Sequence, residues 1–345
     1  METLSDILLN ACIEGASDVH IGNGTVGFRI MGDMQKKEQY DHIPGQEIQF
    51  VKELLGDGGS GNFDDLQDKN LAYETKEGTR FRINIARTMK RFKIVARRIN
   101  DKVPTFEEIG LDPKLIIPNL SKSQGLILVT GPTGSGKSTT LSAMIEYINQ
   151  HESSNIVTLE DPVECIYNPS KSFITQREVG IDTTYEDGLN NVLRQDPDVI
   201  LIGEMRTNES FLAGLKAAET GHLVFSTMHT KSAPETISRV AEMFRADQDS
   251  VLSMFANSIT MIISQSLVRS ASGDKMILVP EIFIPNTATR NNIKDNKTKD
   301  LLAAMETSPN LSKLNSVKNL LNKRLITKAS AESLLSEEEL KNLNK

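Results

Sequence analysis

A glycine-rich segment, GPTGSGKST at 131–139, has the residue types and spacing of a phosphate-binding loop. Its glycines allow backbone N–H groups to approach phosphate oxygens, and the N-terminus of a following helix adds a partial positive charge. In such a loop Lys137 reaches the β- and γ-phosphates of a nucleoside triphosphate, and the Ser138 hydroxyl binds Mg²⁺. The candidate nucleotide-binding residues are Gly131, Pro132, Thr133, Gly134, Ser135, Gly136, Lys137, Ser138 and Thr139.

Carboxylates follow two apolar runs elsewhere in the chain. Glu204 comes shortly after DVILI at 198–202, and Glu160 and Asp161 follow NIVTL at 155–159. Because ligands of open α/β sheets bind at the carboxyl ends of the strands, these side chains should lie beside the phosphate loop. We expect Glu204 to orient and deprotonate the attacking water, and the acidic pair to hold Mg²⁺-bound water. The alternative is that they are surface carboxylates in ordinary turns.

Two histidines, His222 and His229, flank a further apolar run, LVFST at 223–227. We expect them to respond to the γ-phosphate or to its loss, and the alternative is a structural role for each. A zinc pair is not expected, because the strand separates them and no third ligand stands nearby.

The length and composition narrow the class of protein. With 345 residues, 38% apolar and 25% charged, the chain should form two globular domains. The net charge of −7 argues against a general nucleic-acid binder. The two cysteines form no CxxC motif, so neither a disulfide framework nor a structural zinc site is expected. We find no targeting signal and no apolar stretch of about 18 residues, so any action at a membrane would require a partner.

The pattern along the chain changes near residue 100. Residues 1–100 should form an α+β domain, and residues 101–118, with three prolines, an extended linker. From 119 to 345, continuous apolar runs alternate with helical segments, which predicts a mostly parallel sheet covered on both faces. In the first domain we expect helices near 4–11 and 45–55, strands at 19–22, 26–31 and within 71–99, and a loop at 57–65. In the second we expect strands at 126–130, 155–159, 198–202, 223–227 and 276–284, then a helical tail with the apolar stripe Leu311, Leu314, Val317, Leu320 and Leu321 facing the core.

Basic residues are concentrated in residues 79–98, where eight occur without an acidic residue: Arg80, Arg82, Arg87, Lys90, Arg91, Lys93, Arg97 and Arg98. At the start of this segment they alternate with apolar residues, as in a half-buried strand with guanidinium groups on one face. Three interpretations compete. The face is solvated; it is a nucleic-acid groove, although aromatic residues for stacking are lacking; or its arginines contact nucleotide phosphates in their own subunit or a neighbour.

Together these motifs resemble those of the secretion and type IV pilus ATPases, over nearly the whole chain. The matching segments are ASDVHI (16–21) and RIMGDM (29–34) in the N-terminal domain, RFRIN (80–84) as the arginine-bearing strand, TLEDPVE (158–164) as the Asp box, RQDPDVILIGEMR (194–206) as Walker B and TGHLVFSTMHT (220–230) as the His box. Thr207 stands where the family usually has Asp. The segment TATRNNIKDNKTKDL (287–301) resembles the C-terminal motif of the retraction branch, which drives twitching, and the zinc insertion of the assembly branch is absent.

The resemblance implies an α/β chain with an N-terminal PAS-like domain and a RecA-like ATPase domain, assembled as a homohexamer that binds ATP and Mg²⁺. It implies that Glu204 is the catalytic base and that Glu160 assists at the water or at Mg²⁺. The metal candidates are Ser138, Glu204 and Glu160. By the same carry-over, His222 and His229 read the nucleotide state beside Lys137, while Arg82 and Arg97, with Arg80 and Arg91 behind them, complete the site of a neighbouring subunit.

The resemblance also implies a motor in which hydrolysis rotates the two domains and powers pilus retraction. Its partners would be an inner-membrane platform protein and the pilus machinery, and its location the cytoplasm, at the inner face of the bacterial membrane. The alternatives are a pilus assembly or secretion ATPase and a RecA-like nucleic-acid translocase. Direct nucleic-acid binding is not expected, given the acidic balance. A small-molecule kinase would need an acceptor pocket and a lid, which no segment suggests.

Overall fold

The protein was analysed as a computed structural model that describes residues 2–55, 66, 68–99, 102–306 and 309–343. The chain divides into two compact units. The first, unit 1, comprises Met1–Asp101 with Glu164–Ile166, and the second, unit 2, comprises Lys102–Val163 and Tyr167–Lys345. The loop expected at 57–65 lies outside the described residues.

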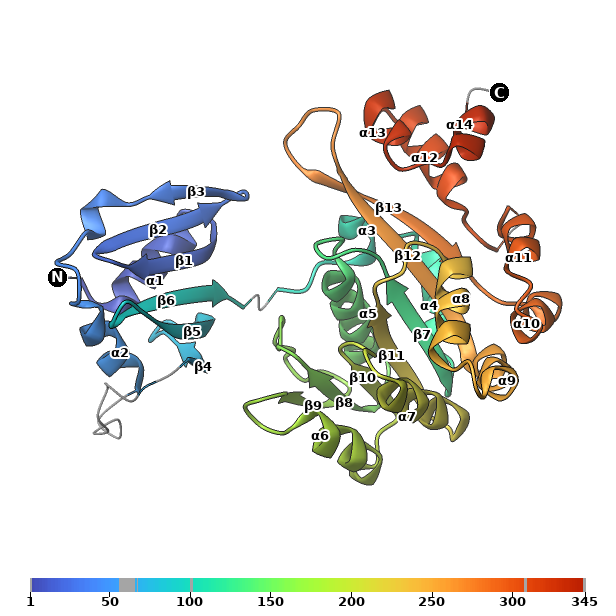
Figure 1. Ribbon diagram of the computed structural model, residues 1–345, viewed down its shortest axis with the longest axis horizontal. Coiled ribbons are helices and arrows are strands. Elements are labelled where there is room, and N and C mark those ends of the chain that lie inside the picture. Colours follow the sequence, from blue (N-terminus) through green and yellow to red (C-terminus); the bar gives the residue numbers. More distant parts are fainter. Residues whose placement is uncertain (1, 56–65, 67, 100–101, 307–308, 344–345) are drawn as a thin grey trace. The chain divides into compact units, whose positions relative to one another are not determined.

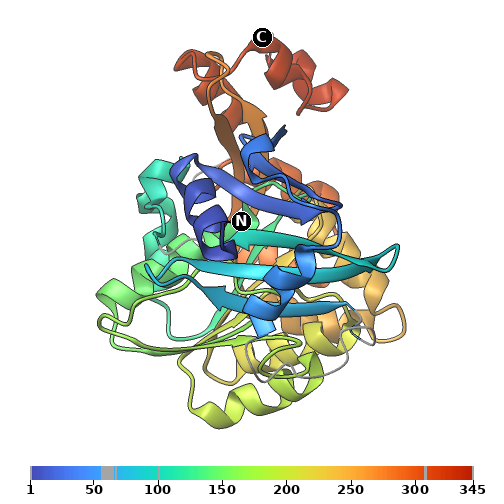
Figure 2. The same cartoon turned by 90° about the vertical axis from the view of Figure 1, so that its left-hand side faces the viewer.

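Unit 1 is a six-stranded sheet with two helices packed on one face (Figures 1 and 2). Its strand order is β3-β2-β1-β6-β5-β4, and every neighbouring pair is antiparallel. Residues of β5 alternate between buried Phe81, Ile83 and Ile85, which join the core, and the arginines of the other face. The elements are α1 (Leu4–Ile13), β1 (Ala16–Gly22), β2 (Thr25–Ile30), β3 (Asp33–Lys36), α2 (Glu47–Leu55), β4 (Lys69–Glu74), β5 (Arg80–Thr88) and β6 (Arg91–Arg98).

Unit 2 has a seven-stranded sheet in the order β13-β12-β7-β11-β10-β8-β9 (Figure 1). The pairs from β12 to β9 are parallel and the β12–β13 pair is antiparallel, so the predicted mostly parallel α/β sheet is confirmed. Its strands are β7 (Gly125–Thr130), β8 (Asn155–Glu160), β9 (Phe173–Glu178), β10 (Val199–Ile202), β11 (Leu223–Met228), β12 (Ile259–Arg269) and β13 (Met276–Phe283). Strands β9 and β12 are not among those predicted from the sequence.

Helices cover both faces of this sheet and form two separate hydrophobic cores. Along β7, Leu126 and Leu128 belong to one core and Ile127 and Val129 to the other, because successive side chains of a strand point to opposite faces. The first core includes residues of α6 (Tyr185–Val192), α7 (Asn208–Glu219), α8 (Ala233–Met243), α9 (Gln248–Ser258), α10 (Thr287–Lys294) and α11 (Thr298–Met305). The second includes residues of α3 (Phe106–Ile109), α4 (Pro113–Leu120) and α5 (Lys137–His151).

The expectation of an extended linker at 101–118 is wrong, because α3 and α4 lie in this segment. Thr105 begins α3 with a capping box, and Asp112 caps α4, which has Pro113 at its first position. Phe106 and Ile116 are buried in the second core of unit 2. Hydrophobic burial and good capping therefore outweigh the backbone hydrogen bond that Pro118 cannot donate within α4.

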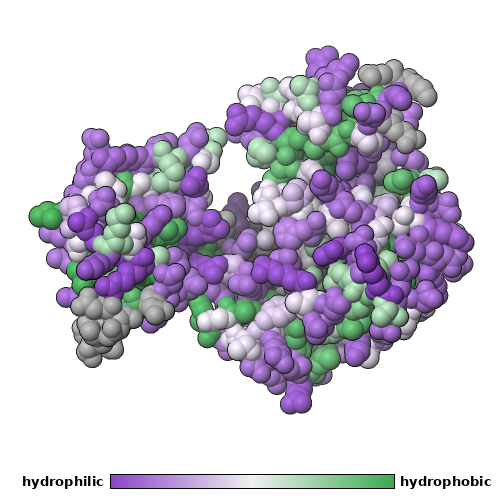
Figure 3. Space-filling model, viewed as in Figure 1, coloured by the Kyte–Doolittle hydropathy of each residue, from purple (hydrophilic) through white to green (hydrophobic). Residues whose placement is uncertain are grey.

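The C-terminal helices α12 (Lys313–Asn322), α13 (Lys328–Glu332) and α14 (Glu337–Leu343) form a small cluster with β12 and β13. Leu314 and Val317 are buried in it, which confirms the core-facing stripe for these two residues. Elsewhere the visible face of each unit is mostly hydrophilic (Figure 3). Exposed hydrophobic residues include Met89 in unit 1 and Phe173 in unit 2. Within the described ranges, we find no helix with the length and apolar character needed to cross a membrane.

Candidate active site

The phosphate loop joins β7 to α5, as the sequence predicts. Gly131 has φ 145°, and a Cβ there would meet the Gln265 carbonyl oxygen and, at 2.6 Å, the Ser135 hydroxyl. Gly136, with φ 85°, begins α5 as its N-cap. The Lys137 ammonium donates to the carbonyl oxygens of Gly131 at 2.9 Å and Pro132 at 3.1 Å, so it already lies over the loop. Residues 132–134 at the tip are exposed, which leaves their backbone accessible to an anion.

Strand β12 supports the phosphate loop from the side, a feature that the sequence analysis missed. Gln265 Nε2 donates to the Ser135 carbonyl at 2.7 Å, and Thr130 Oγ1 donates to Ser264 Oγ at 2.9 Å. Ser135, Thr130, Ser264 and Gln265 are all buried. The loop is therefore fixed to the sheet at both of its flanks.

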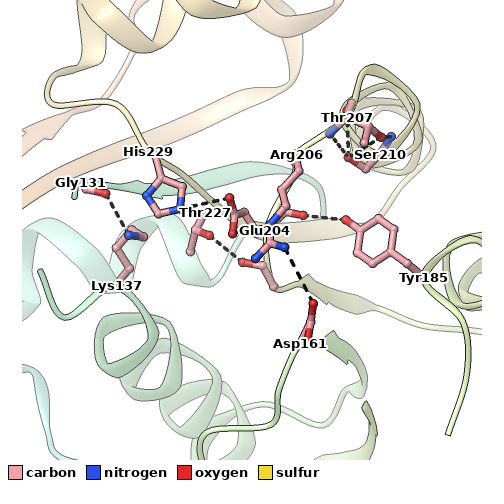
Figure 4. Close-up of polar contacts among 11 residues, drawn as sticks. Gly131, Lys137, Asp161, Tyr185, Glu204, Arg206, Thr207, Ser210, Thr227 and His229 are labelled. Carbon is pink, nitrogen blue, oxygen red and sulfur yellow. Dashed lines mark hydrogen bonds and ion pairs between the residues drawn. The ribbon is translucent and has the colours of Figure 1, made fainter. Parts of the chain in front are cut away.

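Glu204 lies in the connection between β10 and α7, and its carboxylate has a cationic group on one side and an imidazole on the other (Figure 4). Arg206 Nε donates to Oε2 at 2.9 Å, and His229 Nε2 lies 3.1 Å from Oε1. The Glu204 side chain is 22% exposed, so water can reach it. The hydrogen bond to Glu204 is the main cause that raises the pKa of Arg206. This arrangement holds a carboxylate in a defined orientation at the same edge of the sheet as the phosphate loop.

Hydrogen bonds to the backbone hold the loop that carries Glu204. Thr227 Oγ1 donates to the Gly203 carbonyl at 2.7 Å, and Tyr185 Oη donates to the Glu204 carbonyl at 2.6 Å (Figure 4). Neither Thr227 nor Tyr185 was identified from the sequence. Each donates to a main-chain carbonyl oxygen, and such a hydrogen bond requires no particular residue type at the acceptor, so no sequence motif marks it.

Thr207 stands at the position where the family that the chain resembles usually has Asp. Its side chain accepts from the Ser210 N–H, and Ser210 Oγ accepts from the Thr207 N–H at 3.1 Å, which makes a capping box at the start of α7. Thr207 is therefore the N-cap of α7, and the loop that begins at Gly203 ends at this residue.

Glu160 and Asp161 lie at the end of β8, near the same edge. Glu160 Oε1 accepts from Thr158 Oγ1 at 2.7 Å and from Gln176 Nε2 of β9 at 3.2 Å. The carboxylate of Asp161 is 3.9 Å from Arg206. Within this acidic pair it is thus Asp161 that shares Arg206 with Glu204.

The structure does not bring His222 to this site. His222 precedes β11 and its carbonyl accepts from Gly125 N at 3.0 Å, at the opposite end of β7 from the phosphate loop. Because β11 has six residues, it separates His222 from His229 by about 20 Å. His222 Nδ1 lies 2.9 Å from the carbonyl oxygen of Ala217, so within this chain it fixes the end of α7. Of the two expected sensors, only His229 lies beside Glu204.

The arginine candidates lie in unit 1 on the sheet face opposite α1 and α2. Cross-strand pairing places Arg29, Asp18, Arg97 and Arg82 in one row across four strands. Arg97 Nε donates to Asp18 Oδ1 at 2.7 Å, while the Arg97 side chain stays 69% exposed. Burial alone would raise the pKa of Asp18, but the hydrogen bonds from Arg97 and Ser17 outweigh it and the pKa is lowered. Asp18 therefore orients an exposed guanidinium group.

The other two arginine candidates have partners within unit 1. Arg80 Nε donates to Glu74 Oε2 at 2.7 Å, and Arg91 donates to Asn23 Oδ1 at 2.6 Å. The contact of any of these arginines with a nucleotide stays a prediction.

The oxygen ligands at this edge suit Mg²⁺, which is bound through few protein oxygens together with phosphates and water. Ser138 is the second residue of α5 and is half-buried. Glu160 is the last residue of β8, and Glu204 follows the neighbouring strand β10. Across the residues that the structure describes, no group of three His, Cys, Asp or Glu side chains could hold a metal ion by itself.

Comparisons with known proteins find relatives over most of the chain. The family of Type II/IV secretion system proteins matches residues 1–317. The type IV pilus retraction ATPase PilT of Pseudomonas aeruginosa is 36% identical over 335 residues, covering 95% of this chain and 96% of the relative. A twitching motility protein of Neisseria gonorrhoeae is 38% identical, covering 81% of this chain and 75% of the relative. The solved structure of the pilus retraction motor PilT with bound ADP superposes with a TM-score of 0.92 at 34% identity, covering 99% of this chain and all of that one, 100%.

Proposed function

Because the chain belongs to the Type II/IV secretion system protein family, we propose that it is the ATP-hydrolysing motor of type IV pilus retraction. The observation that carries this proposal is the carboxylate of Glu204, held between Arg206 and His229 at the edge of the sheet that also carries the phosphate loop. The full-length likeness to a retraction motor selects pilus retraction among the uses of such a site.

Each residue then has a defined task in hydrolysis. The loop from Gly131 to Thr139 binds the phosphates through its backbone, and Lys137 moves from the loop carbonyls to the β- and γ-phosphates. Glu204 accepts a proton from the water as its oxygen attacks the γ-phosphorus and the bond to the bridging oxygen of ADP breaks. Ser138, with Glu160 and Glu204 nearby, would hold Mg²⁺, which neutralises charge on the phosphates.

The exposed arginines of unit 1 fit a site completed by a second copy of the chain. In a homohexameric ring, Arg97 and Arg82 would approach the phosphates bound by a neighbour, with Arg80 and Arg91 behind them. Loss of the γ-phosphate would release them and allow the two units of a subunit to rotate. The motor would act from the cytoplasm on an inner-membrane platform protein and so withdraw pilins from the fibre.

The reaction is tested by measuring ATP turnover and nucleotide binding for Glu204→Gln. We expect turnover to fall by at least about 100-fold with binding retained, because only the proton acceptor is lost. Glu219→Gln, at the exposed end of α7, is the matched control and should keep wild-type turnover. Equal turnover in wild type and Glu204→Gln would refute the assignment of the base.

The biological role and the ring require separate tests. Deleting the gene in its host should leave pili that are present but static, whereas missing pili would indicate an assembly motor. Mixing Arg97→Ala with Lys137→Ala subunits should restore part of the activity if the arginine acts across a subunit interface, and no recovery would count against that role.

A further inference from the structure

We propose that the Tyr185 hydroxyl is a positioning group for the catalytic carboxylate of Glu204, an inference that rests on the function proposed above. Tyr185 is the first residue of α6, and its Oη donates to the Glu204 carbonyl oxygen at 2.6 Å (Figure 4). The bond joins α6, from 19 residues earlier in the chain, directly to the backbone of the residue that would accept the proton.

The need for such a bond follows from the place of Glu204 in the chain. Glu204 lies outside β10 and α7, and the backbone N–H groups on either side of it, those of Gly203 and Met205, donate to the carbonyl oxygens of Leu159 at 2.8 Å and Thr227 at 3.3 Å. Its carboxylate is oriented by Arg206 and His229, whose side chains are 63% and 47% exposed. Thr227 holds the preceding carbonyl, that of Gly203, from β11. Tyr185 supplies the anchor at residue 204 itself.

Tyr185 is suited to this role by its surroundings. The ring packs against the first core of unit 2, so the hydroxyl is delivered from a fixed direction. Burial raises the pKa of the phenol, and the hydroxyl therefore stays protonated and able to donate throughout the neutral range. The helix does not depend on this bond to begin, because Thr184 caps α6 by accepting from the Asp187 N–H. Removing the oxygen alone should leave the fold in place.

Loss of the Tyr185 hydrogen bond should slow catalysis by displacing the carboxylate of Glu204 from the attacking water. A general base must stay within hydrogen-bond reach of the water it deprotonates, and small displacements are costly in rate. Losing one hydrogen bond that fixes the base corresponds to a fall in kcat of roughly five- to tenfold, with nucleotide affinity unchanged, because the phosphate loop is held by other contacts.

The experiment compares Tyr185→Phe with Tyr147→Phe, which also removes only a phenolic oxygen. Tyr147 lies on α5, where its ring stacks on His151 at 4.1 Å, and it does not contact Glu204 in the described structure. ATP turnover, KM and the affinity for a fluorescent ADP analogue are measured for each variant. We expect Tyr185→Phe alone to lower kcat, with KM and ADP affinity at wild-type values.

A double-mutant cycle shows whether the tyrosine acts through Glu204. In single-turnover assays, Tyr185→Phe should have no further effect in a Glu204→Gln background, since the base is already lost. Wild-type kcat in Tyr185→Phe, or an equal loss with and without Glu204, would overturn the inference. Absence of ATP turnover in the wild-type protein would instead refute the function on which it rests, so the two failures are distinguishable.

Discussion

Replacing Glu281 by Gln should remove a pH dependence of the free energy of unfolding. Glu281 lies on β13 and is 5% exposed, and its Oε1 accepts from the Ala233 N–H at the start of α8 at 2.9 Å. Burial raises the pKa of this carboxyl from 4.5 to about 7, and its charged neighbours Lys313, Glu339 and Glu235 have smaller effects. The folded protein thus holds a proton that the unfolded chain releases more readily.

The sign and size of the effect follow from these two pKa values. Because the folded state binds the proton more tightly, this contribution to stability is fully present below pH 4.5, falls as the pH rises and is lost above about pH 7. The pKa values of Glu281 in the unfolded and folded states differ by roughly 2.5, which corresponds to a change of about 3 kcal/mol in the free energy of unfolding. A glutamine keeps an oxygen for the Ala233 N–H and does not titrate, so the variant should gain stability relative to wild type as the pH rises from 5 to 8.

Urea unfolding at four pH values, followed by circular dichroism, measures this difference between wild type and Glu281→Gln. Taking the difference at each pH cancels the titration of groups that both proteins share. Glu242→Gln, on the exposed face of α8, is the control for removing a carboxylate from the protein surface. If the Glu281→Gln difference is constant between pH 5 and 8, then Glu281 does not titrate with a raised pKa and the reasoning is wrong.

Three further substitutions test other parts of the structure. Thr227→Val keeps the side-chain shape but leaves the Gly203 carbonyl without its donor, so unfolding by urea should show a loss of about 1 kcal/mol and ATP turnover should fall. Thr207→Ala removes the cap of α7 and should cost about 1 kcal/mol in thermal unfolding while nucleotide binding is kept. Phe106→Ala should cost roughly 3–5 kcal/mol in urea unfolding, since Phe106 is buried beneath α5, and an effect under about 1 kcal/mol would contradict its place in the core.

The sequence predicted β7, β8, β10 and β11 because both faces of the sheet are covered and these strands read as continuous apolar runs. It did not predict β12, although this strand also lies inside the sheet. It did not predict β9, whose residues Phe173–Glu178 are mostly polar or half-exposed because this strand lies at the edge of the sheet. The helices within 101–118 were not predicted because three prolines there favour extended backbone, whereas the burial of Phe106 and Ile116 depends on the tertiary fold.

For the site, spacing predicts the phosphate loop and Glu204, because these predictions depend on residue type and on the end of a strand. The anchors Tyr185 and Thr227 could not be found in this way, because a bond to a carbonyl oxygen is available wherever the fold brings a hydroxyl close. The large distance between His222 and His229 could have been predicted from the sequence. A six-residue strand between them already implied opposite ends of the sheet.

The alternation of β7 between two cores also fixes how this protein can change over evolutionary time. Deleting or inserting one residue within Gly125–Thr130 would turn Leu126 and Leu128 toward the helices that now receive Ile127 and Val129, and the reverse. The packing of both helical layers against β7 would then be disrupted, next to the phosphate loop that begins at Gly131. Substitutions by apolar residues of similar size should be accepted along this strand, whereas changes in its length should not appear among functional descendants.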